Sequence, residues 1–174
     1  KAGEDFYFLQ KLIPLGNFTE IKTTTVIPSP RISDRVPFGT GKAMQNYIDN
    51  KSQEHESYNI QSFIDLKQFC EVVPELFDSK EVEFPLSIDE YLNTLNFNVN
   101  IEKIKRNSTS KDHFVKLFYN WFNAFKVLKF MHYSRDNYHP DDTVCKASSQ
   151  LLDLLEINKN DRKLIEVYRE LDKV

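Results

Sequence analysis

The sequence has few glycines, few cysteines and no long apolar segment, and each shortage excludes a class of protein. Its 174 residues include 4 Gly and 2 Cys. Cys70 and Cys145 lie far apart and match no metal-binding spacing, so neither a disulfide framework nor a metal site is indicated, and a reducing compartment is expected. No apolar run reaches the roughly 18 residues that a membrane-spanning helix needs, and no signal peptide is visible. We therefore expect a cytoplasmic protein.

The charge balance excludes a second class of partner. The chain carries 26 acidic and 23 basic residues, which gives a formal net charge of −3. Such a balance provides no sequence-wide attraction to nucleic acid or to an anionic membrane. Charged residues make up 28% and apolar residues 40% of the chain, close to the averages for globular proteins, so we expect a folded core and no nucleic-acid partner.

Apolar residues recur at helical spacing along most of the chain, and scarce glycine agrees with a mainly helical, α+β fold. Pro14 and Gly16 are expected to end the first helix. Ser87 is predicted to cap a later helix, with Glu90 completing a capping box. Residues 97–104 either extend that helix or form a strand. Helices are predicted over residues 4–13, 41–50, 60–73, 87–96, 110–133, 141–156 and 159–172.

Two stretches without helical spacing divide the chain. Residues 18–27 are rich in β-branched side chains that partly alternate, which predicts a strand. Residues 28–42 contain three prolines and two glycines and are predicted to form a structured loop. The polar stretch 51–57 is the best candidate for a hinge. The predicted domains are therefore residues 1–50 and residues 57–174.

Aromatic residues dominate the predicted cores of the helices, with 14 Phe and 8 Tyr in the chain. Phe114, Phe118, Trp121, Phe122 and Phe125 share one broad face of the helix predicted over residues 110–133. Such a row could stack against sugars if it were exposed, but core packing explains it better. The helix over residues 60–73 is predicted from the spacing of Phe63, Ile64, Leu66, Lys67 and Cys70.

Two acids, Glu4 and Asp5, begin the first predicted helix directly after Gly3. Carboxylates in a first helical turn interact favourably with the unpaired N–H groups, and this often is their whole role. A carboxylate fixed there can also take a proton from a nearby hydroxyl group. Gly3 leaves room for a substrate to approach the backbone. The pair by itself allows both interpretations.

A basic loop follows in the stretch PSPRISDRVPFGTG, from residue 28 to residue 41. Arg31 and Arg35 offer planar guanidinium groups that suit phosphate oxygens, although a salt bridge between Arg35 and Asp34 would explain one of them equally well. Gly39 and Gly41 allow backbone N–H groups to approach a ligand, and the start of the next helix adds its dipole. The loop is therefore a candidate anion-binding segment.

Two other patterns do not support a site. The Gly-Thr-Gly-Lys run is not a Walker phosphate loop, because Val36 stands where the first glycine is required and Ala43 where Ser or Thr binds magnesium. His132, His139 and Cys145 fit no known spacing of metal ligands. No metal-binding residue is predicted in this chain.

The Gly-Glu-Asp helix start followed by the Arg-rich Gly-Thr-Gly loop resembles the end of the catalytic domain in bacterial family 2 glycosyltransferases. The resemblance covers about the first quarter of the chain. It implies that Asp5 is the catalytic base and that Glu4 orients the acceptor or the base. The loop differs from the Gln-x-x-Arg-Trp motif of processive members, so processive synthesis is not implied. The implied substrate-binding residues are Arg31, Arg35, Gly39, Thr40 and Gly41.

The same resemblance implies a parent enzyme with a GT-A fold that transfers a sugar, with inversion, from a nucleotide-sugar donor to a carbohydrate or lipid-linked acceptor. Its divalent cation, Mn or Mg, would be held by an Asp-x-Asp motif preceding Lys1. This chain would then be a C-terminal fragment that binds no cation and has no activity alone, located in the cytoplasm or at the inner face of the cell membrane. The alternative is a stand-alone, non-catalytic helical module that binds protein partners, which would not explain the two motifs.

Overall fold

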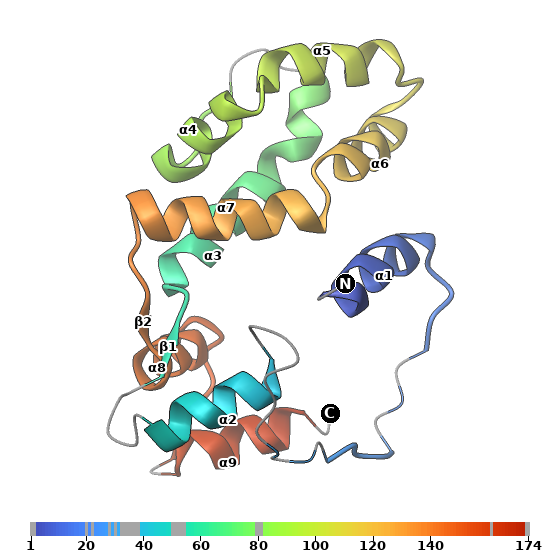
Figure 1. Ribbon diagram of the computed structural model, residues 1–174. Helices are drawn as coiled ribbons and strands as arrows, with labels where there is room; N and C mark the ends of the chain where they lie inside the picture. The colour runs from blue at the N-terminus through green and yellow to red at the C-terminus, as the bar shows by residue number, and fades with distance from the viewer. Residues whose placement is uncertain are drawn as a thin grey trace. The chain divides into compact units, whose positions relative to one another are not determined.

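Nine α-helices and one two-stranded sheet make up the described part of the computed structural model, which is 68% helix (Figure 1). The structure describes residues 3–19, 21, 23–27, 29, 31, 39–49, 55–78, 82–160 and 162–172. The mainly helical class predicted from periodicity and scarce glycine is confirmed. In the described ranges, no helix combines the length and the apolar character needed to cross a bilayer.

The chain divides into two compact units. One contains the residues up to His55 and those after Asn160, and the other runs from Glu56 to Asn160. The first unit holds α1 (Glu4–Leu12), α2 (Thr40–Asp49) and α9 (Leu164–Leu171). The second holds α3 (Ile60–Val72), α4 (Leu86–Thr94), α5 (Phe97–Arg106), α6 (Lys111–Trp121), α7 (Ala124–Asn137) and α8 (Val144–Leu154). Residues 51–54 of the predicted hinge lie outside the described residues, and the division into residues 1–50 and 57–174 stays a prediction.

The first helix ends where the sequence predicts, and the strand expected after it is not found. A 3₁₀ turn over Ile13–Leu15 contains Pro14 and is followed by Gly16 at φ 69°, a left-handed conformation that glycine adopts readily. Residues 18, 19, 21 and 23–27 form no strand, so this prediction is wrong for the described part of the segment. Phe18 and Val26 are 62% and 87% exposed. Their β propensity has no effect without a paired strand and an apolar surface to cover.

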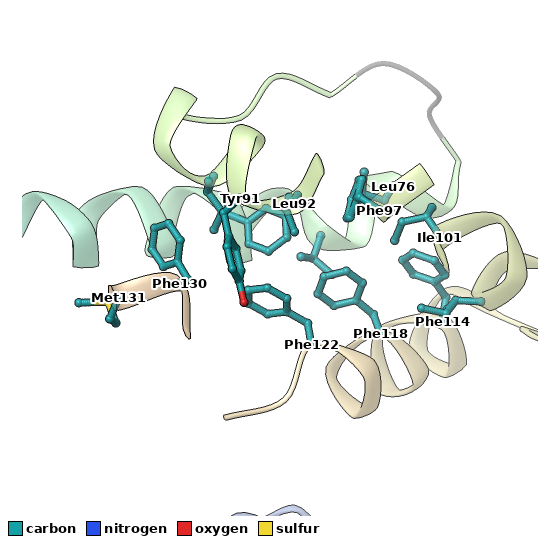
Figure 2. Close-up of a cluster of buried hydrophobic side chains, with 14 residues drawn as sticks. Leu76, Tyr91, Leu92, Phe97, Ile101, Phe114, Phe118, Phe122, Phe130 and Met131 are labelled. Carbon is teal, nitrogen blue, oxygen red and sulfur yellow. The ribbon is translucent and has the colours of Figure 1, made fainter. Parts of the chain in front are cut away.

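The core of the second unit is built from phenylalanine rings (Figure 2). Phe69 of α3 meets Phe118 of α6 at 5.8 Å and Phe122 at 5.2 Å between ring centroids, both edge-on. Such aromatic pairs contribute about 0.5–1.5 kcal/mol beyond the burial of their area. Phe114, Phe118 and Phe122 are buried, which confirms that this part of the row is core and not an exposed stacking platform.

The helix predicted over residues 110–133 is two helices. Ser110 caps α6 as expected, with its hydroxyl accepting from the His113 backbone N–H. After α6, the Asn123 side chain accepts from the backbone N–H groups of Phe125 and Lys126 and starts α7. Asparagine at this position competes with the helical ladder and favours a new N-cap. The Lys126 ammonium donates to the Trp121 carbonyl at 2.7 Å, which satisfies one acceptor at the end of α6.

The predicted cap at Ser87 is also wrong. The N-cap of α4 is Pro85, and Ser87 lies within the first turn, 2% exposed. Its hydroxyl donates to Asp65, whereas a capping hydroxyl would accept from a backbone N–H group of the first turn. Asn96, at φ 52°, separates α4 from α5, and the segment left open between helix and strand is helical.

In α3 the buried face differs from the residues that predicted the helix. Ser62, Asp65 and Phe69 are the buried residues, whereas Phe63 is 46% exposed. Two polar side chains thus lie on the buried face, at positions outside the predicted set. Just before α3, strand β1 (Glu56–Ser57) pairs antiparallel with β2 (Asp142–Thr143), which brings the segment before α3 beside the segment before α8. The sequence did not predict this pairing.

Candidate functional site

The predicted catalytic acids lie at the head of α1. Gly3 is the N-cap at φ 82°, and its carbonyl accepts from the Tyr7 backbone N–H at 3.1 Å, so the helical ladder begins here. Glu4 and Asp5 occupy the first turn and are both exposed. Exposed carboxylates here lie at the positive end of the helix dipole and are accessible to a substrate hydroxyl. The position therefore suits a base.

The predicted phosphate-binding residues lie before and at the start of α2. Arg31 is exposed in irregular backbone, and Arg35 lies outside the described residues. Gly39 adopts φ 95°, a left-handed conformation that favours glycine, and its carbonyl accepts from the Ala43 backbone N–H at 3.0 Å. Helix α2 then begins at Thr40, followed by Gly41. The first N–H groups of a helix have no intrahelical partner and can bind an anion.

The two predicted halves of the site are not joined by any described contact. Among the described residues, no hydrogen bond or ion pair links Asp5 to Arg31. Asp5 and Arg31 are each exposed, as their proposed roles require. Their cooperation in one site stays a prediction.

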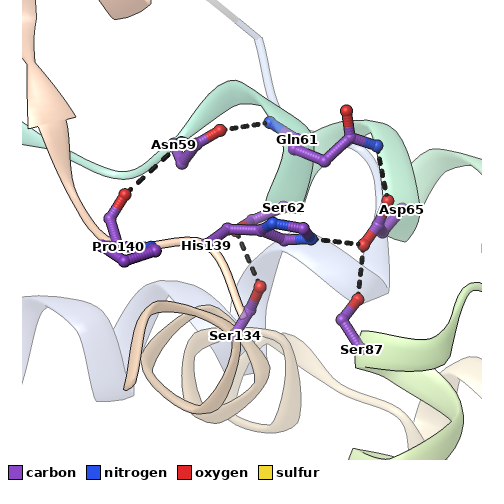
Figure 3. A network of polar contacts seen from close by, with 8 residues as sticks. All are labelled: Asn59, Gln61, Ser62, Asp65, Ser87, Ser134, His139 and Pro140. Atoms are coloured by element: carbon purple, nitrogen blue, oxygen red, sulfur yellow. Dashed lines mark hydrogen bonds and ion pairs between the residues drawn. The ribbon is translucent and has the colours of Figure 1, made fainter. Parts of the chain in front are cut away.

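A polar network that the sequence did not predict lies within the second unit (Figure 3). Asp65 of α3 is 6% exposed, and both of its carboxylate oxygens are engaged. The Ser87 hydroxyl of α4 donates to Oδ2 at 2.5 Å, and the Gln61 amide donates to Oδ1 at 2.8 Å. His139 Nε2 lies 3.0 Å from the same Oδ2 atom. One buried carboxylate thus holds together α3, α4 and the segment that follows α7.

Further hydrogen bonds fasten the same elements. The hydroxyls of Ser62 and Ser134 lie 2.8 Å apart, which connects α3 with α7. The Asn59 side-chain amide donates to the Pro140 carbonyl at 3.4 Å. Both serines are buried, so the hydrogen bond between them replaces the bonds to water that their hydroxyls lose on burial. The network therefore fastens α3 to α4, to α7 and to the segment after α7.

Serine, histidine and aspartate meet here, but not in the order that nucleophilic catalysis needs. A nucleophilic serine must give its proton to a histidine, which the carboxylate orients from the other side. In this network the carboxylate of Asp65 stands in the middle and receives bonds from both Ser87 and His139. Ser87 is also only 2% exposed and out of reach of a substrate. The arrangement supports a structural role.

The pKa of Asp65 reflects these contacts. Burial by itself raises the pKa, but hydrogen bonds from Ser87, Gln61 and His139 outweigh burial and hold it below the ordinary value of 3.8. The carboxylate is therefore ionised under all mild conditions. A group that stays ionised and fully bonded stabilises the fold and does not shuttle protons.

Other side chains with shifted pKa values are poorly suited to proton transfer. Burial raises the pKa of Tyr91 and of Tyr119 to about 12 in each case. Tyr91 uses its hydroxyl to donate to the Lys126 carbonyl at 2.8 Å. Burial also raises the pKa of the Cys70 thiol, which keeps it protonated and weakly nucleophilic.

A groove of about 520 Å³ lies between the 3₁₀ turn at Val73–Phe77, residues 82–84, α4 and α5. Its lining combines aromatic rings, including Phe84 and Phe97, with carboxylate and amide side chains, including Asp89 and Asn93. A volume of this size lies within the range of small-ligand sites. None of the residues singled out in the sequence lines this groove.

No group of three or more His, Cys, Asp or Glu side chains in the described ranges could hold a metal ion. The Asp-x-Asp ligands that the resemblance implies for the parent enzyme would precede Lys1 and are not among these residues. His132, His139 and Cys145 do not form such a group either.

Comparisons of the chain with protein-family models, with curated proteins and with solved structures found no significant match.

Proposed function

We propose that this chain is the C-terminal part of a nucleotide-sugar-dependent glycosyltransferase similar to the bacterial family 2 enzymes. The observation that carries the proposal is the head of α1, where Asp5 is exposed in the first helical turn after a left-handed Gly3. The exposed Arg31 and the start of α2 after Gly39 provide the second motif in the expected order. The proposed place of action is the cytoplasm or the inner face of the cell membrane.

In the proposed reaction, the acceptor hydroxyl loses its proton to the Asp5 carboxylate while its oxygen attacks the anomeric carbon of the donor sugar. The bond between that carbon and the diphosphate oxygen breaks, and the nucleotide diphosphate leaves with the electron pair. A single displacement inverts the anomeric configuration. Arg31 and the free N–H groups at the start of α2 have the right charge to stabilise the leaving diphosphate. In this proposal the donor site and its cation belong to the preceding α/β part of the protein.

The test is an Asp5→Asn substitution in the full-length protein. We expect kcat for sugar transfer to fall by at least about 100-fold, the usual effect of losing a general base, while nucleotide-sugar binding is retained. Asp112→Asn is the matched control, because Asp112 is also an exposed acid in the first turn of a helix, α6. Full activity of the Asp5→Asn protein would exclude Asp5 as the base.

A non-catalytic helical interaction module remains the competing proposal. It predicts that the full-length protein transfers no sugar and that no α/β domain with an Asp-x-Asp motif precedes this chain. Translating the upstream gene sequence separates the two proposals before any assay is run. The transferase proposal also predicts that these 174 residues alone give no turnover.

A further inference from the structure

The groove beside α4 and α5 has a fixed aromatic side. Phe84 is partly buried, and its ring meets Phe69 edge-on at 5.3 Å and Phe97 edge-on at 5.6 Å. These contacts fix the ring while part of it remains exposed to the groove. A preformed apolar surface of this kind suits the C–H face of a sugar ring, and little side-chain entropy is lost when it binds.

The rim of the groove is polar and available for hydrogen bonding. Glu83 and Asp89 contribute carboxylates, and Asn93 and Asn98 contribute amides. Among the described residues, these four side chains make no ion pair or hydrogen bond with one another or with any neighbour. Carboxylates accept hydrogen bonds from hydroxyls, and amides both donate and accept. A ligand with many hydroxyl groups could satisfy both kinds of group at once.

The charge of the rim narrows the class of ligand. Two carboxylates disfavour phosphates, nucleotides and sugar acids, which would meet like charges at short range. The described lining lacks the three ligating groups that a metal ion would need. A purely apolar partner would bury the carboxylates without a hydrogen-bond donor, which is costly. A neutral saccharide avoids all three difficulties.

We propose that this groove binds a neutral saccharide, with the sugar ring against Phe84 and its hydroxyls bonded to Asp89, Asn93 and Asn98. In the transferase, the groove binds a sugar unit of the acceptor, an assignment that rests on the proposed function. Saccharide binding by itself does not depend on that function. It can therefore be measured on this chain alone.

The experiment records NMR chemical shifts of the 174-residue protein during titration with neutral oligosaccharides of glucose, galactose and N-acetylglucosamine. We expect at least one of them to shift the signals of Asn93 and Asn98 with a Kd of about 1 mM, the range of a small contact surface. Asn93→Ala should weaken that Kd by about fivefold, the effect of losing one hydrogen bond. Asn120→Ala is the matched control, since Asn120 is an exposed asparagine on α6 outside the groove and should leave the Kd unchanged.

Three outcomes would overturn the proposal. The first is that no neutral oligosaccharide shifts these signals at about 10 mM. The second is that a uronic-acid oligosaccharide binds as well as the neutral ones, and the third is that Asn93→Ala binds as tightly as the native chain. All three results would leave the Asp5 test unaffected. In the full-length enzyme, Asn93→Ala should raise the acceptor KM with kcat unchanged, whereas Asp5→Asn should lower kcat.

Discussion

Replacing Asp65 by alanine should destabilise the second unit more than any other single change of a charged residue in its described part. The substitution removes both carboxylate oxygens, which accept from Ser87 at 2.5 Å and from Gln61 at 2.8 Å and lie 3.0 Å from His139 at the nearest atom. These three partners come from two helices and a connecting segment. Their loss therefore loosens tertiary contacts and not only a local turn.

The magnitude follows from what each partner loses. A hydrogen bond to a charged group contributes about 1.5–3 kcal/mol, and an unsatisfied buried hydroxyl costs about 1–3 kcal/mol. Ser87 is 2% exposed and cannot turn to water, whereas the His139 side chain is 24% exposed and can. We therefore expect Asp65→Ala to lower the free energy of unfolding by about 3 kcal/mol. Asp65→Asn retains one acceptor oxygen and should cost about 1–2 kcal/mol.

Urea unfolding, followed by far-ultraviolet circular dichroism and by the fluorescence of Trp121, measures this loss. Trp121 is the only tryptophan in the sequence and lies beside the core of the second unit, so its signal reports on that unit. Asp153→Ala is the control, because Asp153 is 66% exposed in its ion pair with Lys159 and should contribute less than about 1 kcal/mol. A loss below about 0.5 kcal/mol for Asp65→Ala would refute the reasoning.

The same residue predicts a dependence on pH. The pKa of Asp65 is lower in the folded protein than its ordinary value of 3.8, so the unfolded chain binds more protons between the two pKa values. The stability that Asp65 contributes is therefore complete above that ordinary value and is lost as the pH falls through the folded pKa. The difference in stability between the native protein and Asp65→Asn should be constant from about pH 5 to pH 7 and should shrink below about pH 4. A difference that grows on acidification would contradict the assigned direction.

Two further substitutions test the core and a helix boundary. Phe118→Ala should lower the free energy of unfolding by about 3–5 kcal/mol, because the ring is fully buried against Phe69. Urea denaturation would measure this loss, and a value below about 1 kcal/mol would contradict the packing. Asn123→Ala should cost about 1 kcal/mol by removing the cap on the Phe125 and Lys126 N–H groups, whereas Asn123→Asp should retain the cap and most of the stability. Equal melting temperatures for the alanine variant and the native protein would argue against the cap.

The positions of most helices were predictable because their signals are local. Pro14 and Gly16 mark the end of the first helix, and Ser110 marks the beginning of α6, since each acts on backbone groups within four residues. The exposed acids at the start of α1 could be predicted from the sequence for the same reason. At Asn123 the local sequence allowed either a continuous helix or a new N-cap, and the helical pattern alone did not indicate the break between α6 and α7.

The Asp65 network could not be predicted in this way, because its partners are distant in sequence. Ser87 and His139 lie 22 and 74 positions from Asp65 along the chain. A helical pattern assigns a charged residue to the solvent face, since burial of an unpaired carboxylate is costly. Asp65 does lie four positions before the fully buried Phe69, on the same helical face, and this was the only signal available beforehand. The burial of this carboxylate can be understood only from the fold, which places a hydroxyl, an amide and an imidazole beside it. Together these groups compensate the cost of burying the charge.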